Sequence, residues 1–205
     1  GGLLGLETEY HDLHYAATNI SAAWAVYEDT VADCLNGITQ GDTSSTRDGR
    51  KYTIKSIHIK GSLYLTEQTG LSAIPVSPVV AVAVVLDTQT NGTQLTATDV
   101  YESPTTDVYG FRKLSNTIRF RILKYMYIPM NYGGVVQKTS GSNTIEALGC
   151  RIPIDINIQK NILVQTTGTG ATVSVIADNS IHVIACASLA DKVKIGYNSR
   201  IRFVG

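Results

Sequence analysis

The sequence predicts an all-β fold in which antiparallel strands form a sandwich. Val, Ile, Thr, Ser and Gly are abundant, and this mixture favours strands and turns over helices. Several segments alternate apolar and polar residues, and no strand–helix–strand rhythm indicates a parallel sheet. With 205 residues, of which 43% are hydrophobic and 17% charged, the chain can bury a sizeable core. We therefore expect residues 1–205 to form a single domain.

The strand expected at 51–66 shows the alternation most fully. One face carries Ile57, Ile59, Leu63 and Leu65, and the other carries His58, Lys60, Ser62 and Tyr64. Tyr52 and Ile54 have the opposite phase. An extra residue near Lys55 and Ser56 reconciles the two halves, so the sequence predicts a β-bulge there.

The remaining strands follow in chain order. They are expected over part of 7–20 and at 79–86, 117–130, 150–159, 162–165, 181–187 and 193–205, with Val173 and Val175 extending a strand. Segments 79–86 and 181–187 are apolar on both faces, which indicates strands in the middle of a sandwich. Pro129 lacks an amide donor, so its strand ends there or lies at an edge. About eight strands in two sheets is the count of an antiparallel jelly roll.

Long connections separate these strands. The segments 21–46, 88–116 and 131–149 have turn residues and little periodicity. Loops of this length in a compact domain are usually functional or form interaction surfaces. We expect these three loops to form subunit interfaces and the outer surface.

Enzymatic chemistry is not indicated. The sequence lacks the GxSxG, HExxH, CxxC and P-loop motifs, and its four histidines are scattered. Cys34, Cys150 and Cys186 are odd in number and lack metal-ligand spacing, so we expect reduced thiols and neither a metal nor a cofactor. The apolar run 79–86 is too short to cross a bilayer, and no signal peptide is recognised, so we expect no membrane insertion and a protein that is soluble and intracellular when made.

Charge is unevenly distributed along a chain of zero net charge. Seven acids and no Lys or Arg precede Arg47, whereas 17 bases and 10 acids follow from Arg47 onward. Acidic and basic solvated faces would explain this pattern, and so would a subunit with one side facing a polyanion.

Two groups of bases lie near aromatic residues. The candidates for contact with nucleic acid are Arg47, Arg50, Lys51, Arg112, Lys113, Arg119 and Arg121. Lys55 and Lys60 extend the first group, and Lys124 extends the second. Cations that neutralise phosphates beside rings that stack on bases are typical of single-stranded nucleic-acid binding. A solvated strand face with tyrosine as ordinary sheet residues is the alternative explanation.

Four sequence landmarks follow one another along the chain. The first is ITQG…TRDGRKYTIKSIHIKGSL, in which the basic head Arg47, Gly49, Arg50, Lys51 precedes the strand Ile54, Lys55, Ser56, Ile57, Ile59, Gly61. The others are VVLDTQTNG, NTIRFRIL and the ending YNSRIRFVG. Together they resemble the capsid proteins of circovirus- and geminivirus-like viruses, whose circular single-stranded DNA encodes a replication initiator. The landmarks occur in that family's order across nearly the whole chain.

This resemblance implies a jelly-roll coat protein that assembles with itself into a small icosahedral shell. The simplest shell has T=1 symmetry, with sixty copies around circular single-stranded DNA bound without sequence preference. The implied location is the virion, with assembly in the nucleus or cytoplasm of the host cell. The sequence does not identify a host receptor.

The sequence departs from the family in two places. Lys124-Tyr125-Met126 stands where relatives often have Tyr-Asp-Lys, and GGLLGL stands where they usually have a basic arm. Either the sequence is the ordered part of a longer protein, or the strand faces alone hold the genome, or the particle is empty. Two other functions stay open: a cellular jelly-roll binding module of carbohydrate-binding or cytokine-like type, and a cupin-type enzyme.

Overall fold

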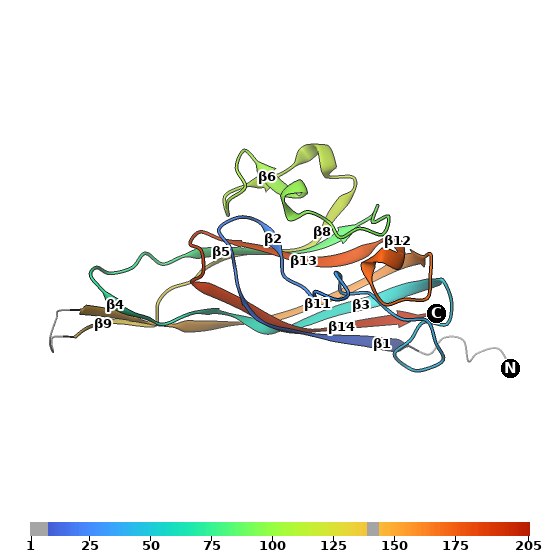
Figure 1. The fold of residues 1–205 in the computed structure, drawn as a ribbon, viewed down its shortest axis with the longest axis horizontal. Coiled ribbons are helices and arrows are strands. Elements are labelled where there is room, and N and C mark those ends of the chain that lie inside the picture. Colours follow the sequence, from blue (N-terminus) through green and yellow to red (C-terminus); the bar gives the residue numbers. More distant parts are fainter. Residues whose placement is uncertain (1–7, 139–143) are drawn as a thin grey trace.

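The computed structural model describes residues 8–138 and 144–205 (Figure 1). Its strands are β1 (Glu9–Asn19), β2 (Ala25–Val26), β3 (Lys51–Leu65), β4 (Gln68–Leu71), β5 (Val79–Asp87), β6 (Tyr101–Ser103), β7 (Phe111–Arg112), β8 (Phe120–Pro129), β9 (Gly134–Lys138), β10 (Thr144–Leu148), β11 (Cys150–Thr166), β12 (Ile176–Asp178), β13 (Ser180–Ala187) and β14 (Val193–Val204). Short 3₁₀ turns are η2 (Ala97–Asp99), η3 (Leu114–Asn116) and η4 (Val173–Val175).

Two antiparallel sheets face each other. The five-stranded sheet has the order β1-β14-β3-β11-β12, and the four-stranded sheet has the order β2-β13-β5-β8. The eight principal strands are, in chain order, β1, β2, β3, β5, β8, β11, β13 and β14. When they are renumbered 1 to 8, the order is 1-8-3-6 in one sheet and 2-7-4-5 in the other, which is jelly-roll connectivity. The predicted all-β, eight-stranded antiparallel jelly roll is therefore confirmed.

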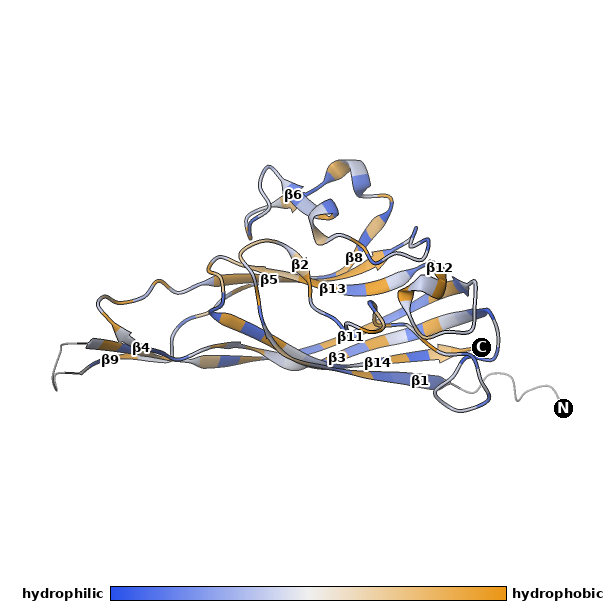
Figure 2. Cartoon of the chain, viewed as in Figure 1, coloured by the Kyte–Doolittle hydropathy of each residue, from blue (hydrophilic) through white to orange (hydrophobic). Residues whose placement is uncertain are grey.

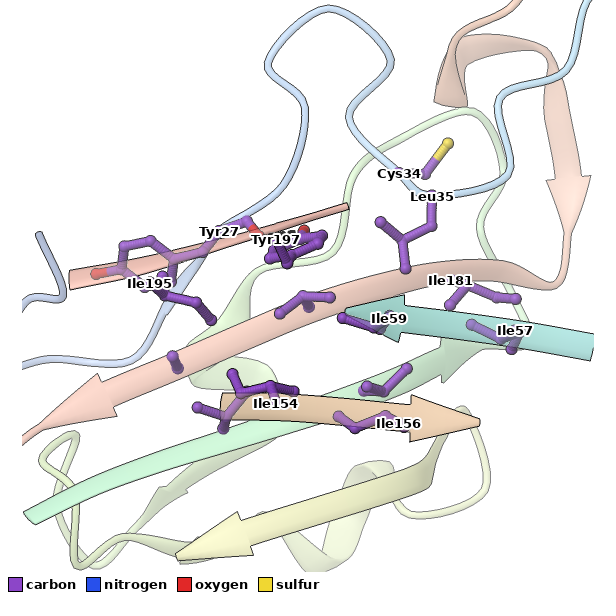
Figure 3. Close-up of a cluster of buried hydrophobic side chains, with 14 of the residues drawn as sticks. Tyr27, Cys34, Leu35, Ile57, Ile59, Ile154, Ile156, Ile181, Ile195 and Tyr197 are labelled. Carbon is purple, nitrogen blue, oxygen red and sulfur yellow. Dashed lines mark hydrogen bonds between the residues drawn. The ribbon is translucent and has the colours of Figure 1, made fainter. Parts of the chain in front are cut away.

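The core fills the space between the sheets. Ile57 and Ile59 of β3 lie near Leu35 and Ile181 in this layer, and all four are at most 2% exposed (Figure 3). Figure 2 shows alternating hydrophobic and hydrophilic bands along β3 and β14, whereas β5 is predominantly hydrophobic. This contrast means that the outer side of the five-stranded sheet meets solvent, while both sides of β5 are covered.

The second cover of β5 comes from the segment that connects β5 to β8, residues 88–119, which we call the β5–β8 excursion. It lies over the outer side of the four-stranded sheet (Figure 1). Ala81, Ala83 and Val85 pack beneath it in a second buried cluster with Trp24 and Tyr101. The Trp24 ring stacks on Tyr101 at 4.4 Å, and its Nε1–H donates to the Asp107 carbonyl at 2.9 Å. The excursion is thus held firmly to the sheet.

Several details of the strand prediction are confirmed. Arg202 pairs with Ser56 and Phe203 with Ile54, which leaves Lys55 as the extra residue of a bulge at the predicted position. The strand that ends at Pro129 is β8, and it lies at the edge of its sheet.

Other details of the prediction are wrong. The expected loop 131–149 contains the hairpin β9–β10, with β4 paired to β10. Residues 162–165 continue β11, because a register shift between Gln159 and Ile162 lets one strand stay paired with β3. Residues 173–175 form η4. β8 begins at Phe120, so Ile118 lies outside the expected inner face and is 82% exposed.

Candidate nucleic-acid interface

The outer side of β3 and β14 is basic. Antiparallel pairing places Lys60 opposite Asn198, His58 opposite Arg200 and Ser56 opposite Arg202. The bulge turns Lys55 outward beside this row, and its side chain is exposed together with those of Lys60 and Arg202. We call Lys51, Lys55, Lys60, Arg200 and Arg202 the basic face. It lies on the side of the molecule opposite the β5–β8 excursion (Figure 1).

Two shallow depressions run along this face. The larger, of about 560 Å³, is lined by residues that include His14, His58, Lys60 and Arg202. The second, of about 380 Å³, is lined in part by Lys55, and it shares His58 and Arg202 with the first. A chain of phosphates could therefore lie across both depressions without rearrangement of the strands.

Part of the basic face is already neutralised. Arg200 donates two hydrogen bonds to the carboxylate of Asp12, at 2.7 and 2.6 Å, and these bonds lower the Asp12 pKa. His58 Nε2 lies 2.7 Å from Asp155 Oδ1. Within residues 8–138 and 144–205, Lys51, Lys55, Lys60 and Arg202 form no ion pair with a carboxylate. These four cations are the ones that phosphates can neutralise.

Aromatic rings flank the cations. The Arg200 guanidinium lies 4.9 Å from the ring centroid of Tyr10, and the Arg151 guanidinium lies 5.1 Å from that of Tyr64. Each ring is at least partly exposed. An exposed ring beside a cation offers a base a stacking surface that does not discriminate between sequences.

The first predicted group is divided by the structure. Arg50 and Lys51 are both exposed: Lys51, a member of the basic face, is the first residue of β3, and Arg50 just before it continues that face. Arg47 is 0% exposed. Its Nε donates to the Ile38 carbonyl at 2.7 Å, Nη1 donates to the Gly49 carbonyl at 2.5 Å, and Nη2 donates to the Gly168 carbonyl. The expectation that Arg47 meets DNA is corrected, because a guanidinium enclosed by three carbonyls cannot reach a phosphate.

The second predicted group lies elsewhere. Arg112, Lys113, Arg119 and Arg121 belong to the β5–β8 excursion and β8, on the other sheet. Arg119 donates to both oxygens of buried Asp87 at 3.0 and 3.2 Å, and these bonds raise its pKa. Lys113 pairs with Glu102 at 2.8 Å, and Arg112 Nη2 donates to the Phe120 carbonyl at 2.6 Å. Arg121 is exposed. The structure does not bring the two predicted groups onto one surface.

Sequence reasoning missed the contribution of β14. Arg200 and Arg202 alternate with buried Ile201 and Phe203, so the sequence predicts that both bases point outward. It does not predict that β14 lies beside β3, because eight strands can pair in many orders. That pairing creates the basic face.

A buried hydrogen-bonded chain has the order of a serine–histidine–acid triad. Ser180 Oγ lies 2.6 Å from His182 Nε2, and His182 Nδ1 lies 2.8 Å from Glu28 Oε1. Ser180 and His182 are 0% exposed and Glu28 is 3% exposed, so a substrate carbonyl has no route to the hydroxyl. These hydrogen bonds connect β13 to the segment after β2 and satisfy Ser180 Oγ, both ring nitrogens of His182 and one carboxylate oxygen of Glu28.

The described residues lack two other kinds of feature. They contain no cluster of three or more His, Cys, Asp or Glu side chains able to hold a metal ion. In the same residues, no helix is both long enough and apolar enough to cross a membrane.

His11 should make folding stability depend on pH. Its side chain points inward from β1, Nε2 has no hydrogen-bond partner, and burial lowers its pKa despite nearby Asp12 and Asp29. The unfolded chain therefore binds a proton at higher pH than the folded chain does. The free energy of unfolding should decline as pH falls below about 6.5, the ordinary histidine value.

Urea denaturation across pH 5 to 8 measures this effect. The decline should be smaller in His11→Gln, which cannot take up a proton. The same decline in His14→Gln as in the parent protein is the control, because His14 is exposed. An unchanged slope in His11→Gln would contradict the assignment.

No family model matches the sequence, and no curated protein matches it. Among solved structures, the chain is similar to the 60-mer BFDV capsid protein, with 8% identity, coverage of 97% of this chain and 93% of that one, and a TM-score of 0.35. It is also similar to a CocE/NonD-family hydrolase from Staphylococcus aureus (12% identity, 97% and 37% coverage, TM-score 0.20). A third likeness is to VP2 of infectious bursal disease virus (10% identity, 97% and 41% coverage, TM-score 0.17). Because all three TM-scores lie below 0.5, the fold assigned to this chain rests on its own strand order.

Proposed function

We propose that this chain is a structural capsid subunit that assembles with itself into a T=1 icosahedral shell of sixty copies around circular single-stranded DNA. The observation that carries the proposal is the jelly-roll order β1-β14-β3-β11 opposite β2-β13-β5-β8. The four sequence landmarks of the capsid family, in the family's order, support it. Residues 1–205 act in this proposal as one non-enzymatic domain, and the protein is part of a virion.

The basic face is the proposed contact with the genome. It combines four cations without a carboxylate partner in the described residues, two depressions and flanking rings. Arg50 extends it. Binding through phosphates and stacked bases is independent of sequence and weakens with salt. In the shell this face turns toward the interior. Arg112, Lys113, Arg119 and Arg121, of the β5–β8 excursion and β8, are a separate candidate contact.

A closed shell makes a direct prediction of mass. Sixty chains of 22.1 kDa give particles of about 1.3 MDa. Light scattering with negative-stain imaging, in buffer of near-physiological salt, should show uniform round particles of that mass. A monomer or trimer over a wide concentration range would contradict the shell.

A jelly-roll binding module is the second candidate. It is favoured by an exposed aromatic groove of about 460 Å³ that Tyr109, Phe111, Tyr125 and Tyr127 line together with Val108 and Gly110. Trp24, the only tryptophan, is 4% exposed and does not contribute a surface for sugar stacking. A binding module would stay small in solution and bind a soluble glycan, so the same mass measurement separates the two candidates.

A further inference from the structure

The aromatic groove is built before any partner arrives. Tyr125 and Tyr127 project from β8, and Tyr101 stacks on Tyr125 with ring centroids 5.7 Å apart. The opposite wall is the turn at 105–111, where Asp107 Oδ1 accepts hydrogen bonds from Thr105 Oγ1 at 2.6 Å and from the Tyr109 amide at 3.0 Å. The Trp24 bond to Asp107 anchors this wall to the core.

A glycine shapes the turn. A Cβ at Gly110 would lie 2.6 Å from the Thr105 carbonyl oxygen, so any larger residue would push the two arms of the turn apart. The groove is therefore a fixed feature of the excursion. Its rings are unusually accessible: Phe111 is 71% exposed, Tyr109 60% and Tyr127 49%. Apolar surface of this extent commonly marks an interaction site.

A second apolar surface lies in the connection from β4 to β5. Ile74 is 70% exposed and Val76 is 75% exposed, and Pro75 and Pro78 flank Val76. Residues 74–78 have no helix or strand assignment. Each proline fixes its own φ and pushes the preceding residue toward extended backbone. The sequence Ile-Pro-Val-Ser-Pro is thus largely ordered in advance, and binding it costs little conformational entropy.

We propose that residues 74–78 of one copy dock into the aromatic groove of a neighbouring copy. Proline-containing extended segments are recognised by aromatic grooves, where rings pack on prolines and apolar side chains enter between the rings. Tyrosine hydroxyls at the groove edge can donate to carbonyls of the docked segment. Residues 68–86 have no charged side chain, and none of the six residues that line the groove is charged. Asp107 belongs to the turn that forms one wall, where its carboxylate accepts the hydrogen bonds from Thr105 and the Tyr109 amide.

The contact joins two different patches, so it is heterologous. Repeated around an axis, a heterologous contact closes into a ring. The docking thus supplies a rotation axis for the shell, and in this respect it rests on the proposed function. The high exposure of Ile74 and Val76 means that the chain does not satisfy the contact within one copy.

Cross-linking between two single-cysteine variants tests the docking. Both are made with Cys150→Ser, because Cys34 and Cys186 are buried. Val76→Cys and Tyr109→Cys are mixed, allowed to assemble and treated with a short bifunctional maleimide. We expect a covalent dimer in the mixture and none from either variant alone. Val31→Cys mixed with Tyr109→Cys is the matched control, since Val31 is 78% exposed and lies outside both surfaces.

The outcomes separate docking from shell assembly. Particles of about 1.3 MDa, the mass of sixty chains, without the 76–109 cross-link would overturn the docking alone. Small rings with that cross-link would support docking and contradict the shell. Dimers from Tyr109→Cys alone would mean that the groove pairs with itself, which overturns the docking. A monomer at every concentration, or a soluble glycan bound in the groove of a monomer, would overturn both proposals.

A substitution gives an independent readout. Val76→Ser should raise the concentration needed for assembly by about tenfold or more, since a buried valine side chain contributes at least that factor. Val31→Ser should leave it unchanged. Circular dichroism of both variants should match the parent, because both positions are exposed in the single chain. Equal assembly by both variants would overturn the docking.

Discussion

Replacing Arg47 with alanine should lower the free energy of unfolding by about 3–5 kcal/mol, the range for a buried polar network that loses one partner. The guanidinium holds three carbonyls, those of Ile38, Gly49 and Gly168, which belong to three separate segments. Alanine would leave these carbonyls without their donor and open a cavity beside them. Equilibrium denaturation with urea, followed by circular dichroism, measures the change.

Arg50→Ala is the matched control. It removes the same charge three positions along the chain from an exposed site, and its effect on unfolding should stay within about 0.5 kcal/mol. Arg47→Lys should recover only part of the stability, because an ammonium cannot reproduce the planar fork of the guanidinium. If Arg47→Ala were as stable as the parent protein, the structural role of this arginine would be wrong.

Arg47 and Arg50 also illustrate what sequence can predict. Both stand in the same basic head before the same strand, and no local pattern distinguishes them. Arg47 is buried because the fold brings the Gly168 carbonyl, which is distant in the sequence, within hydrogen-bond distance of its guanidinium. The alternation of Ile57, Ile59 and their neighbours, by contrast, is local, so both the strand and its solvent side could be predicted.

The same distinction explains the other errors. β9 and β10 pair mainly with each other and β4, and their short, weakly alternating segments resemble loop in a single sequence. The sequence could identify 79–86 as a strand that is buried on both faces. It could not identify the β5–β8 excursion as the segment that covers the outer face of that strand. The basic face depends on which strands are neighbours, and that is a property of the whole fold.

Neutralising the basic face should weaken binding to single-stranded DNA about 50-fold at 0.15 M salt. The variant is Lys55→Gln, Lys60→Gln, Arg202→Gln, which leaves the Arg200–Asp12 pair intact. Each phosphate contact on single-stranded DNA contributes about 0.7 to the slope of log affinity against log salt, so three lost contacts should reduce that slope by about two. Fluorescence anisotropy of a labelled oligonucleotide, titrated from 0.05 to 0.5 M NaCl, measures both quantities.

The matched control removes equal charge from residues that lie outside the basic face. Lys113→Gln, Arg121→Gln, Lys124→Gln lowers the net charge by the same three units and leaves the buried Asp87–Arg119 pair intact. If the basic face holds the DNA, the salt slope of this control should stay close to that of the parent. Equal losses in both variants would mean that binding follows net charge alone, and a larger loss in the control would transfer the contact to the second predicted group.

Base composition provides the last test of the interface. The contacts available on the basic face are charges and the faces of rings, and every base has a face that can stack. Oligonucleotides of equal length and different sequence should therefore bind with similar affinity and the same salt slope. Tyr10→Ala should reduce affinity without changing the slope, because stacking releases no counterions. A change in slope on removing this ring would show that Tyr10 acts by positioning Arg200, which lies against it.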